Sequence, residues 1–358
     1  MRRPFAITVM ILASVTILSN APGLLAQSVE DDPTLTRLLR YPDIHQDRIV
    51  FVYAGDIWTV ASSGGQARQL TSHAGMELYP KFSADGRWIA FSGEYDGTRQ
   101  VYVMPSEGGN PRQLTFYNDV GPMPPRGGTD YRIYGWTPDG SNVVFRANRL
   151  PWGQRMGRPY QVPVSGGLET PLTIPESGGA DLSPDGTQVV FTPKVREFRT
   201  WKRYRGGRAQ DVLVYDLEAN TARQITDDPA TDNQPVWVDG TVYFTSDREW
   251  KLNLYSLDPS GGDARRVTNH AEYDVLWPSG GPGGVVYENG GWIWRFDPDS
   301  QETAVVPIRV AGDLPYTQPM LKNVSDGIQT AAISPSGARA LFEARGDLFT
   351  VPALSLIH

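Results

Sequence analysis

A short phrase of residues recurs along this chain and constrains its fold more than any other feature. Each copy combines a turn ending in Asp-Gly or Ser-Gly with an apolar run that finishes in an aromatic residue. The clearest copies cover residues 82–91, 136–145, 182–191 and 333–342, and weaker copies end at Phe51, Phe244 and Tyr287. Successive aromatic ends lie between 40 and 55 residues apart. Periods of this length, built from short strands, are typical of a β-propeller.

Each repeat predicts four antiparallel strands. The Asp-Gly pair favours a tight hairpin, because Gly adopts positive φ freely and Asp tolerates it. An apolar run such as 189–191 follows, then an alternating segment such as 211–215, and then a short motif that ends in Thr. Short runs rich in β-branched and aromatic residues predict strands rather than helices. We therefore expect an all-β fold, a six-bladed β-propeller of four-stranded blades within residues 27–310.

The repeat breaks after Val310. Residues 311–327 carry no clear copy, and Pro315 and Pro319 disfavour regular structure there, so this stretch is expected to be a linker. A new unit starts at Ile328 and lacks its fourth strand. Because a lone partial blade cannot bury its faces, we expect residues 328–358 to be the truncated first blade of a second propeller, with further domains missing from this chain.

Residues 1–26 have the pattern of a secretory signal peptide. Arg2 and Arg3 precede an uncharged run from Phe5 to Leu18, and a short segment then leads to Ala26. The run is shorter than the roughly 20 residues of a membrane-spanning helix, which favours cleavage after Ala26 and no stable membrane span afterwards. Since the chain has no Cys, we expect a periplasmic or secreted protein that folds without disulfides.

No catalytic residue, metal site or cofactor is expected within this chain. The four His lack metal-ligand spacing, no Gly-x-Ser-x-Gly occurs, and the glycine-rich stretch 280–284 has no phosphate-loop lysine. The recurring Asp85, Asp139 and Asp185 are best explained by turn geometry. The net charge of −7 argues against a nucleic-acid partner.

Residues 194–208 are the compositional outlier of the chain. They hold seven cations against one acid, with aromatic residues interleaved at three-residue steps, and should form a long hairpin or loop in the fourth blade. Such a surface could hold a peptide carboxylate or a neighbouring domain through Arg pairs. Alternatively, the aromatics pack on the blade while the cations face water or pair weakly. The candidate contact residues are Arg196, Arg199, Trp201, Lys202, Arg203 and Arg205.

The sequence resembles the N-terminal part of the tricorn protease family. The resemblance rests on Leu39-Arg-Tyr-Pro-Asp-Ile44, on Tyr53-Ala-Gly-Asp-Ile-Trp58, on residues 196–207 and on the restart at 333–349. It covers nearly the whole chain after residue 26. It implies a six-bladed propeller, then a seven-bladed one, a PDZ-like module and two mixed domains with a serine peptidase site for oligopeptides. The implied partners are peptides, the protein's own C-terminal domains and further copies in a homo-oligomer.

The resemblance implies a function for the whole protein rather than for this chain alone. The family's nucleophilic serine and its partners lie in the C-terminal half, so this chain should be inactive and should gate peptide passage or mediate assembly. Family members are typically described as cytoplasmic, in contrast to the export signal. Two alternatives stay open: a non-enzymatic Tol-type binding propeller, and the propeller of a prolyl-oligopeptidase-like hydrolase with a downstream Gly-x-Ser-x-Gly.

Overall fold

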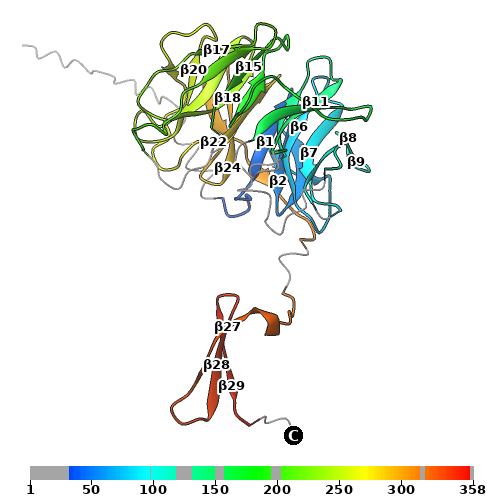
Figure 1. Ribbon diagram of the computed structural model, residues 1–358, viewed down its shortest axis with the longest axis vertical. Coiled ribbons are helices and arrows are strands. Elements are labelled where there is room, and N and C mark those ends of the chain that lie inside the picture. The colour runs from blue at the N-terminus through cyan, green and yellow to red at the C-terminus, as the bar shows by residue number, and fades with distance from the viewer. Residues whose placement is uncertain are drawn as a thin grey trace, which may run out of the picture. The chain divides into compact units, whose positions relative to one another are not determined.

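A computed structural model describes residues 32–96, 98–117, 131–149, 157–194, 203–314 and 319–354. The chain divides into two compact units, Met1–Gly312 and Asp313–His358, and each is considered by itself. Strands make up nearly all the regular structure that is described, apart from a three-residue 3₁₀ turn, η3 (Ser325–Gly327) (Figure 1). The predicted all-β class is therefore confirmed.

The described part of the first unit contains six four-stranded antiparallel sheets, each made of strands in chain order. The first sheet consists of β1 (Arg40–His45), β2 (Arg48–Tyr53), β3 (Asp56–Ala61) and β5 (Arg68–Gln69). The second consists of β6 (Glu77–Phe82), β7 (Trp88–Gly93), β8 (Gln100–Pro105) and β9 (Arg112–Gln113). The third consists of β10 (Arg132–Trp136), β11 (Asn142–Ala147), β12 (Arg158–Pro163) and β13 (Thr170–Pro171). The fourth sheet consists of β14 (Ala180–Leu182), β15 (Gln188–Phe191), β16 (Leu213–Asp216) and β17 (Thr221–Gln224). The fifth consists of β18 (Asp232–Val238), β19 (Thr241–Ser246), β20 (Asn253–Leu257) and β21 (Arg265–Arg266). The sixth consists of β22 (Leu276–Gly281), β23 (Gly284–Asn289), β24 (Trp292–Asp297) and β25 (Glu302–Val305).

The first strands of these sheets form the inside of a ring. In the order β1, β6, β10, β14, β18 and β22, each first strand contacts the next, and β22 contacts β1 again. Figure 1 shows β1, β6, β18 and β22 near the middle of this unit. The other strands of each sheet follow outward in chain order. This radial arrangement is that of a β-propeller, as the repeat predicted.

The aromatic residue that ends each copy of the recurring phrase packs in the core between sheets. In the second strands of the six sheets, Phe51, Phe91, Phe145, Phe191, Phe244 and Tyr287 are all at most 5% exposed. Burying one such side chain contributes about 1.5–3 kcal/mol. The repeat is therefore first of all a core motif.

The Asp-Gly turns are held by side-chain hydrogen bonds. The carboxylates of Asp85, Asp139 and Asp185 each accept a hydrogen bond of 2.6 Å from the Ser or Thr hydroxyl two residues earlier. The glycine after each Asp has a φ near +70°, which other residues rarely adopt. These hydrogen bonds lower the pKa of Asp85 and Asp139 to about 2. The three acids therefore serve the turns, as expected.

The Thr that ends most repeats ties the fourth strand to the third. The Thr71 hydroxyl accepts a hydrogen bond of 2.8 Å from the Ile57 amide. Thr115, Thr226 and Thr268 do the same for Val101, Val212 and Leu254, at 2.9–3.0 Å. The hydroxyl thus satisfies an amide that the very short fourth strand leaves free.

Ring closure depends on short contacts between the two ends of the first unit. β26 (Ile308–Arg309) pairs in parallel with β4 (Gly65–Gln66). Arg40 Nε donates to Glu288 Oε2 over 2.9 Å, and the Tyr41 amide donates to the other oxygen of Glu288 over 2.6 Å. Burial raises the pKa of Glu288 to about 7, and Arg40 opposes that shift. Each described four-stranded sheet is built from one stretch of the chain. The first and sixth sheets therefore share no strand, and these contacts join them.

A buried carboxyl pair lies between the first and second sheets. Glu77 is fully buried and Asp56 is 2% exposed. Thr71 Oγ1 lies 3.2 Å from Glu77 Oε2, and the Gln69 amide donates to Asp56 over 3.0 Å. Burial, and then the neighbouring Asp56, raise the pKa of Glu77 to about 8. Glu77 is therefore mostly protonated in the folded protein at neutral pH.

The second unit is a three-stranded sheet of β27 (Ile328–Ile333), β28 (Arg339–Ala344) and β29 (Asp347–Pro352). Every residue of β27 and β29 is exposed, including Ile333 at 77% and Phe349 at 39%. The expected restart at Ile328 therefore forms strands whose apolar side chains are uncovered. That this sheet begins a second propeller, after a linker at 311–327, stays a prediction.

The closing contact can be tested with Arg40→Ala. This change leaves the carboxylate of Glu288 in a site where its side chain is only 7% exposed, without its cation. We expect a loss of about 1–3 kcal/mol, seen as a lower midpoint of thermal unfolding. Arg87→Ala is the matched control, because its ion pair with Asp85 is exposed and contributes less than about 1 kcal/mol. Equal midpoints for the two variants would contradict the closing role.

The carboxyl pair predicts a pH dependence of stability. The ordinary pKa of Glu77 is 4.5 and its folded pKa is about 8, so the folded chain keeps a proton that the unfolded chain releases. The stabilising effect is fully present below pH 4.5 and is lost as pH rises through about 8. Relative to Glu77→Gln, the parent protein should lose about 4 kcal/mol between about pH 5 and about pH 8.5 in denaturant unfolding. Asp85→Asn is the control, and its free energy of unfolding should change with pH as that of the parent does. If the free energy of unfolding of Glu77→Gln also changed in parallel with that of the parent, the raised pKa of Glu77 would be refuted.

Candidate functional site

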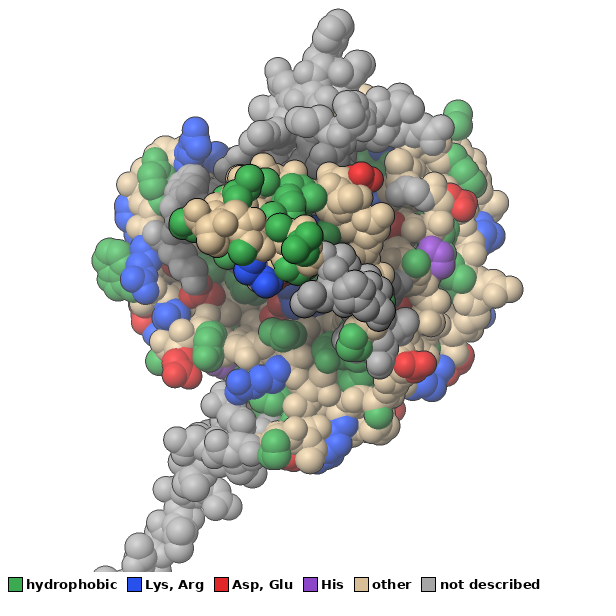
Figure 2. Space-filling view, turned by 90° about the horizontal axis from the view of Figure 1, so that it is seen from below, with side chains coloured by type: hydrophobic (Ala, Val, Ile, Leu, Met, Phe, Trp, Pro, Cys, Tyr) green, Lys and Arg blue, Asp and Glu red, His purple; other side chains and the backbone are tan. Residues whose placement is uncertain are grey.

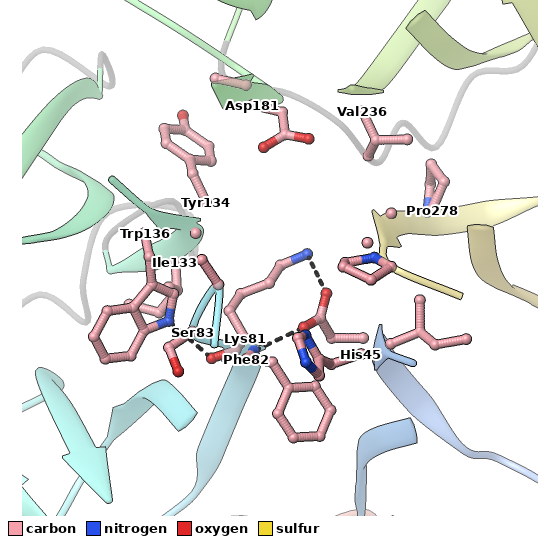
Figure 3. A pocket seen from close by; sticks show the side chains of 18 of the residues that line it. His45, Lys81, Phe82, Ser83, Ile133, Tyr134, Trp136, Asp181, Val236 and Pro278 are labelled. Carbon is pink, nitrogen blue, oxygen red and sulfur yellow. Dashed lines mark hydrogen bonds and ion pairs between the residues drawn. The ribbon is translucent and has the colours of Figure 1, made fainter. Parts of the chain in front are cut away.

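A cavity of about 160 Å³ lies on the axis of the ring (Figure 3). Its lining includes residues from the first strands of all six sheets, β1, β6, β10, β14, β18 and β22. Because every sheet contributes its innermost strand, this cavity is the central channel of the propeller. It is called the channel from this point on.

A β-bulge shapes the inner strand in most sheets. Pairing with the second strand shifts by one residue within β1, β6, β10, β18 and β22. In four of these strands the bulge holds a residue with φ near +50°, followed by proline: Tyr41-Pro42, Tyr79-Pro80, Gln234-Pro235 and Trp277-Pro278. Such a bulge bends the strand and redirects the side chains that follow. The proline fits there because its missing N–H is not needed where the ladder is interrupted.

The register of the sheets places six residues at one level of the channel. Each pairs with the residue immediately before the buried aromatic of the second strand. We call these residues the channel ring: Asp43, Lys81, Gly135, Asp181, Val236 and Ser279. The ring therefore carries two acids and one cation among six positions.

One side of the channel ring is an ion-paired cluster. Lys81 Nζ lies 3.2 Å from Asp43 Oδ1, and the Phe82 amide donates to the other oxygen of Asp43 over 2.8 Å. The Ser279 hydroxyl hydrogen-bonds with both Lys81 Nζ and Asp43. This cluster thereby joins side chains from the first, second and sixth sheets at the channel.

Asp181 lies on the opposite side of the channel and faces Lys81 across it (Figure 3). One carboxylate oxygen accepts from the Trp237 amide over 2.8 Å, and the other from the Leu182 amide over 3.0 Å. Among the described residues it forms no ion pair. Burial raises the pKa of Asp181 to about 6, opposed by the Trp237 amide and by the charge of Lys81. Near neutral pH it is therefore mostly ionised.

An aromatic cluster lies beside the channel, on residues near the start of three of the first strands. The ring of Tyr41 lies 4.5 Å from that of Tyr79 and 4.9 Å from that of Trp277, measured between centroids. The guanidinium of Arg132 lies 5.0 Å from the centroid of Trp277. A smaller cavity of about 20 Å³ is lined by these residues, together with Lys81 and Ile133, which also line the channel. Aromatic and proline side chains make up most of its lining, whereas the channel ring is polar.

The basic segment lies away from the channel lining where it is described. Arg196, Arg199, Trp201 and Lys202 are outside the described residues. Arg203 donates from its amide to Asp247 over 3.0 Å and from Nε to the Trp250 carbonyl over 2.8 Å. Arg205 pairs with Asp247 at 2.9 Å and lies over the ring of Trp250. These two cations thus contact the fifth sheet's hairpin, and a peptide or domain contact of the segment stays a prediction.

Around the rim of one face, basic and acidic side chains are interspersed rather than separated by sign (Figure 2). Within the described ranges, no group of three or more His, Cys, Asp or Glu is placed to hold a metal ion. Nor does that part of the chain include a helix long and apolar enough to cross a membrane.

The sequence reasoning did not identify the channel ring. A signal was present: an aromatic-proline pair recurs shortly before the turn in Tyr41-Pro42, Tyr79-Pro80 and Trp277-Pro278. The residue after each pair belongs to the channel ring. The pair marks the bulge, and so it marks the channel.

Comparison with known proteins agrees with this architecture. Residues 36–302 match the family described as the tricorn protease N-terminal beta propeller domain. The chain is 27% identical over 315 residues to the tricorn protease homolog of Saccharolobus solfataricus, covering 86% of this chain and 28% of that protein. It is 27% identical over 322 residues to the tricorn protease of Thermoplasma acidophilum, covering 88% of this chain and 29% of that protein.

A solved structure shows the same fold. The crystal structure of the tricorn protease superimposes with a TM-score of 0.72 at 25% identity, covering 88% of this chain and 30% of the other. A putative TolB from Agrobacterium tumefaciens, at 19% identity and a TM-score of 0.53, shares the fold alone. The chain thus spans less than a third of the tricorn proteins named above. On the match of residues 36–302, this chain belongs to the tricorn protease family, whose N-terminal propeller it contains.

Proposed function

We propose that this chain is the N-terminal part of an exported, tricorn-like serine peptidase that acts on oligopeptides. Its propeller controls the passage of peptides to or from catalytic domains that lie outside this chain. The single observation that carries this proposal is the channel, because all six sheets contribute to it and its ring is polar. Since the chain spans under a third of its relatives, peptide hydrolysis belongs to the larger protein, and this chain alone is inactive.

The channel is shaped as a gate rather than as an open pore. Asp43 and Lys81 of the ion-paired cluster line the channel, and the aromatic side chains of Tyr41 and Trp277 line the smaller cavity beside it. A peptide would pass only if these side chains moved, and their hydrogen bonds and ring contacts would re-form behind it. Backbone groups of a passing peptide would exchange hydrogen bonds with the polar ring, which lowers the cost of leaving water.

Assembly is a second proposed role, carried by other surfaces. The strands β27 and β29 of the second unit expose apolar side chains along their whole length. In the intact protein we expect further strands to cover them and build a second propeller. The basic segment 194–208 would then contact a neighbouring domain or a further copy of the protein.

A plug in the channel tests the gating role. Gly135 belongs to the channel ring, and a Cβ built there meets no atom within 4 Å. In the full-length protein, Gly135→Phe should fill the channel and reduce kcat/KM for oligopeptides by more than tenfold. Gly135→Ala leaves the channel open and is the matched control, with thermal unfolding to verify that both variants fold. Equal hydrolysis by Gly135→Phe and Gly135→Ala would show that peptides take another route.

The assembly role is tested by replacing Arg199, Lys202 and Arg203 with Ala together. If the basic segment binds a neighbouring domain or copy, this triple variant of the full-length protein should form smaller particles by light scattering. An effect on peptide KM at unchanged size would instead assign the segment to peptide binding. Replacement of Arg87, Arg112 and Arg223 is the control, because each has an exposed contact elsewhere in the propeller. If the triple variant behaves like this control in both measurements, the segment packs locally.

A further inference from the structure

We infer that the channel contains a binding site for a primary ammonium group, with Asp181 as its anion. The ligand is the α-ammonium of an oligopeptide or the side chain of a peptide lysine. The peptide part of this inference rests on the proposed function, whereas the ammonium site stands on geometry alone.

Two sheets of the propeller hold their channel carboxylates in the same way. Asp43 and Asp181 hold equivalent positions in the channel ring, because each pairs with the residue before the buried aromatic of its sheet. Each also accepts a hydrogen bond from a backbone amide of the next sheet, Phe82 for Asp43 and Trp237 for Asp181, and both bonds measure 2.8 Å. The chain thus builds the same carboxylate site twice.

The two sites differ in the residue that precedes the donating amide. At the first site it is Lys81, whose ammonium lies 3.2 Å from Asp43. At the second site it is Val236, which has no charge to offer. Asp181 is therefore fixed by the same kind of backbone hydrogen bond as Asp43. The position equivalent to Lys81 is the apolar Val236, so it supplies no cation.

The channel also offers space in front of Asp181. The channel has a volume of about 160 Å³, and a protein cavity of about 150 Å³ accommodates benzene, with six non-hydrogen atoms. The side chain of lysine beyond Cα has five such atoms. Val236 and Ile133 line the same space and would contact its methylene groups, as they would those of an N-terminal residue.

The shape of the cation also matters. Each oxygen of Asp181 already accepts one backbone hydrogen bond, which leaves about two of the four acceptor positions of the carboxylate. A guanidinium would need both remaining positions to lie on one edge. A compact ammonium with three donors needs only one remaining lone pair, and its other hydrogens can reach neighbouring acceptors. Lys81 does this at Asp43, where Ser279 is its second partner. The site should therefore prefer lysine or an N-terminus to arginine.

The direct test uses n-butylammonium as the probe and n-butanol as its neutral control. Saturation-transfer NMR with this chain should show butylammonium binding and at least tenfold weaker binding to Asp181→Asn. Val236→Lys should abolish binding as well, because it would copy the Asp43–Lys81 pair at the second site. Binding that is equal in parent, Asp181→Asn and Val236→Lys, or equal for butylammonium and butanol, would overturn the inference.

A second arm connects the site to peptides and distinguishes the two sources of ammonium. In the full-length protein, KM is compared for a free oligopeptide, its N-acetylated form, and N-acetylated forms with one internal Lys or Arg. Asp181→Asn should raise KM at least tenfold only for peptides with an ammonium that enters the site. If Gly135→Phe blocks hydrolysis while Asp181→Asn leaves all KM values unchanged, the channel conducts peptides but the ammonium site is wrong. If butylammonium binds while Gly135→Phe has no effect, the site stands and the passage of peptides fails.

Discussion

The pairing between the first and second strands of each sheet is the constraint on which the rest of the structure depends. The repeated aromatic of the second strand is buried between sheets, and the residue before it pairs with a member of the channel ring. A shift of register by one residue would exchange the two faces of the strand. Burial of the aromatic therefore also determines which side chains line the axis. Core packing and channel chemistry are two results of the same register.

The bulges and the closing contacts complete that arrangement. Tyr41-Pro42 and Trp277-Pro278 interrupt the ladders of the first and sixth strands of the inner ring and redirect the residues after them toward the axis. The ends of the first unit are joined by β26 with β4 and by Arg40 with Glu288. Because Asp43 and Ser279 come from the sheets on either side of this junction, the hydrogen bond between them depends on closure. The channel cluster is thus sensitive to how well the ring closes.

Local features of the fold were predictable from the sequence, and the channel was not. Asp85-Gly86 predicts a turn because the backbone geometry that favours this pair involves only the four residues of the turn. Phe91 ends an apolar run whose composition by itself indicates a buried strand. The contact of Phe82 with Asp43 spans 39 residues, and that of Lys81 with Ser279 spans 198. Such contacts exist only once the ring has formed, so no local pattern names the partners. For the basic segment, the unusual composition was evident from the sequence, but the contacts were not. In the structure, Arg203 and Arg205 contact Asp247 of the adjacent sheet.

In the proposed function the channel of the propeller is the path of a peptide, and Asp181 is the residue that contacts its positive charge. The most direct measurement is a cryo-electron microscopy structure of the full-length protein, catalytically inactivated and saturated with an oligopeptide that has a free N-terminus. The account predicts peptide density on the propeller axis, with the ammonium nitrogen next to Asp181 and the Tyr41–Trp277 contact displaced. Peptide density that reaches the catalytic domains by another route, with the channel still closed by its side chains, would contradict it.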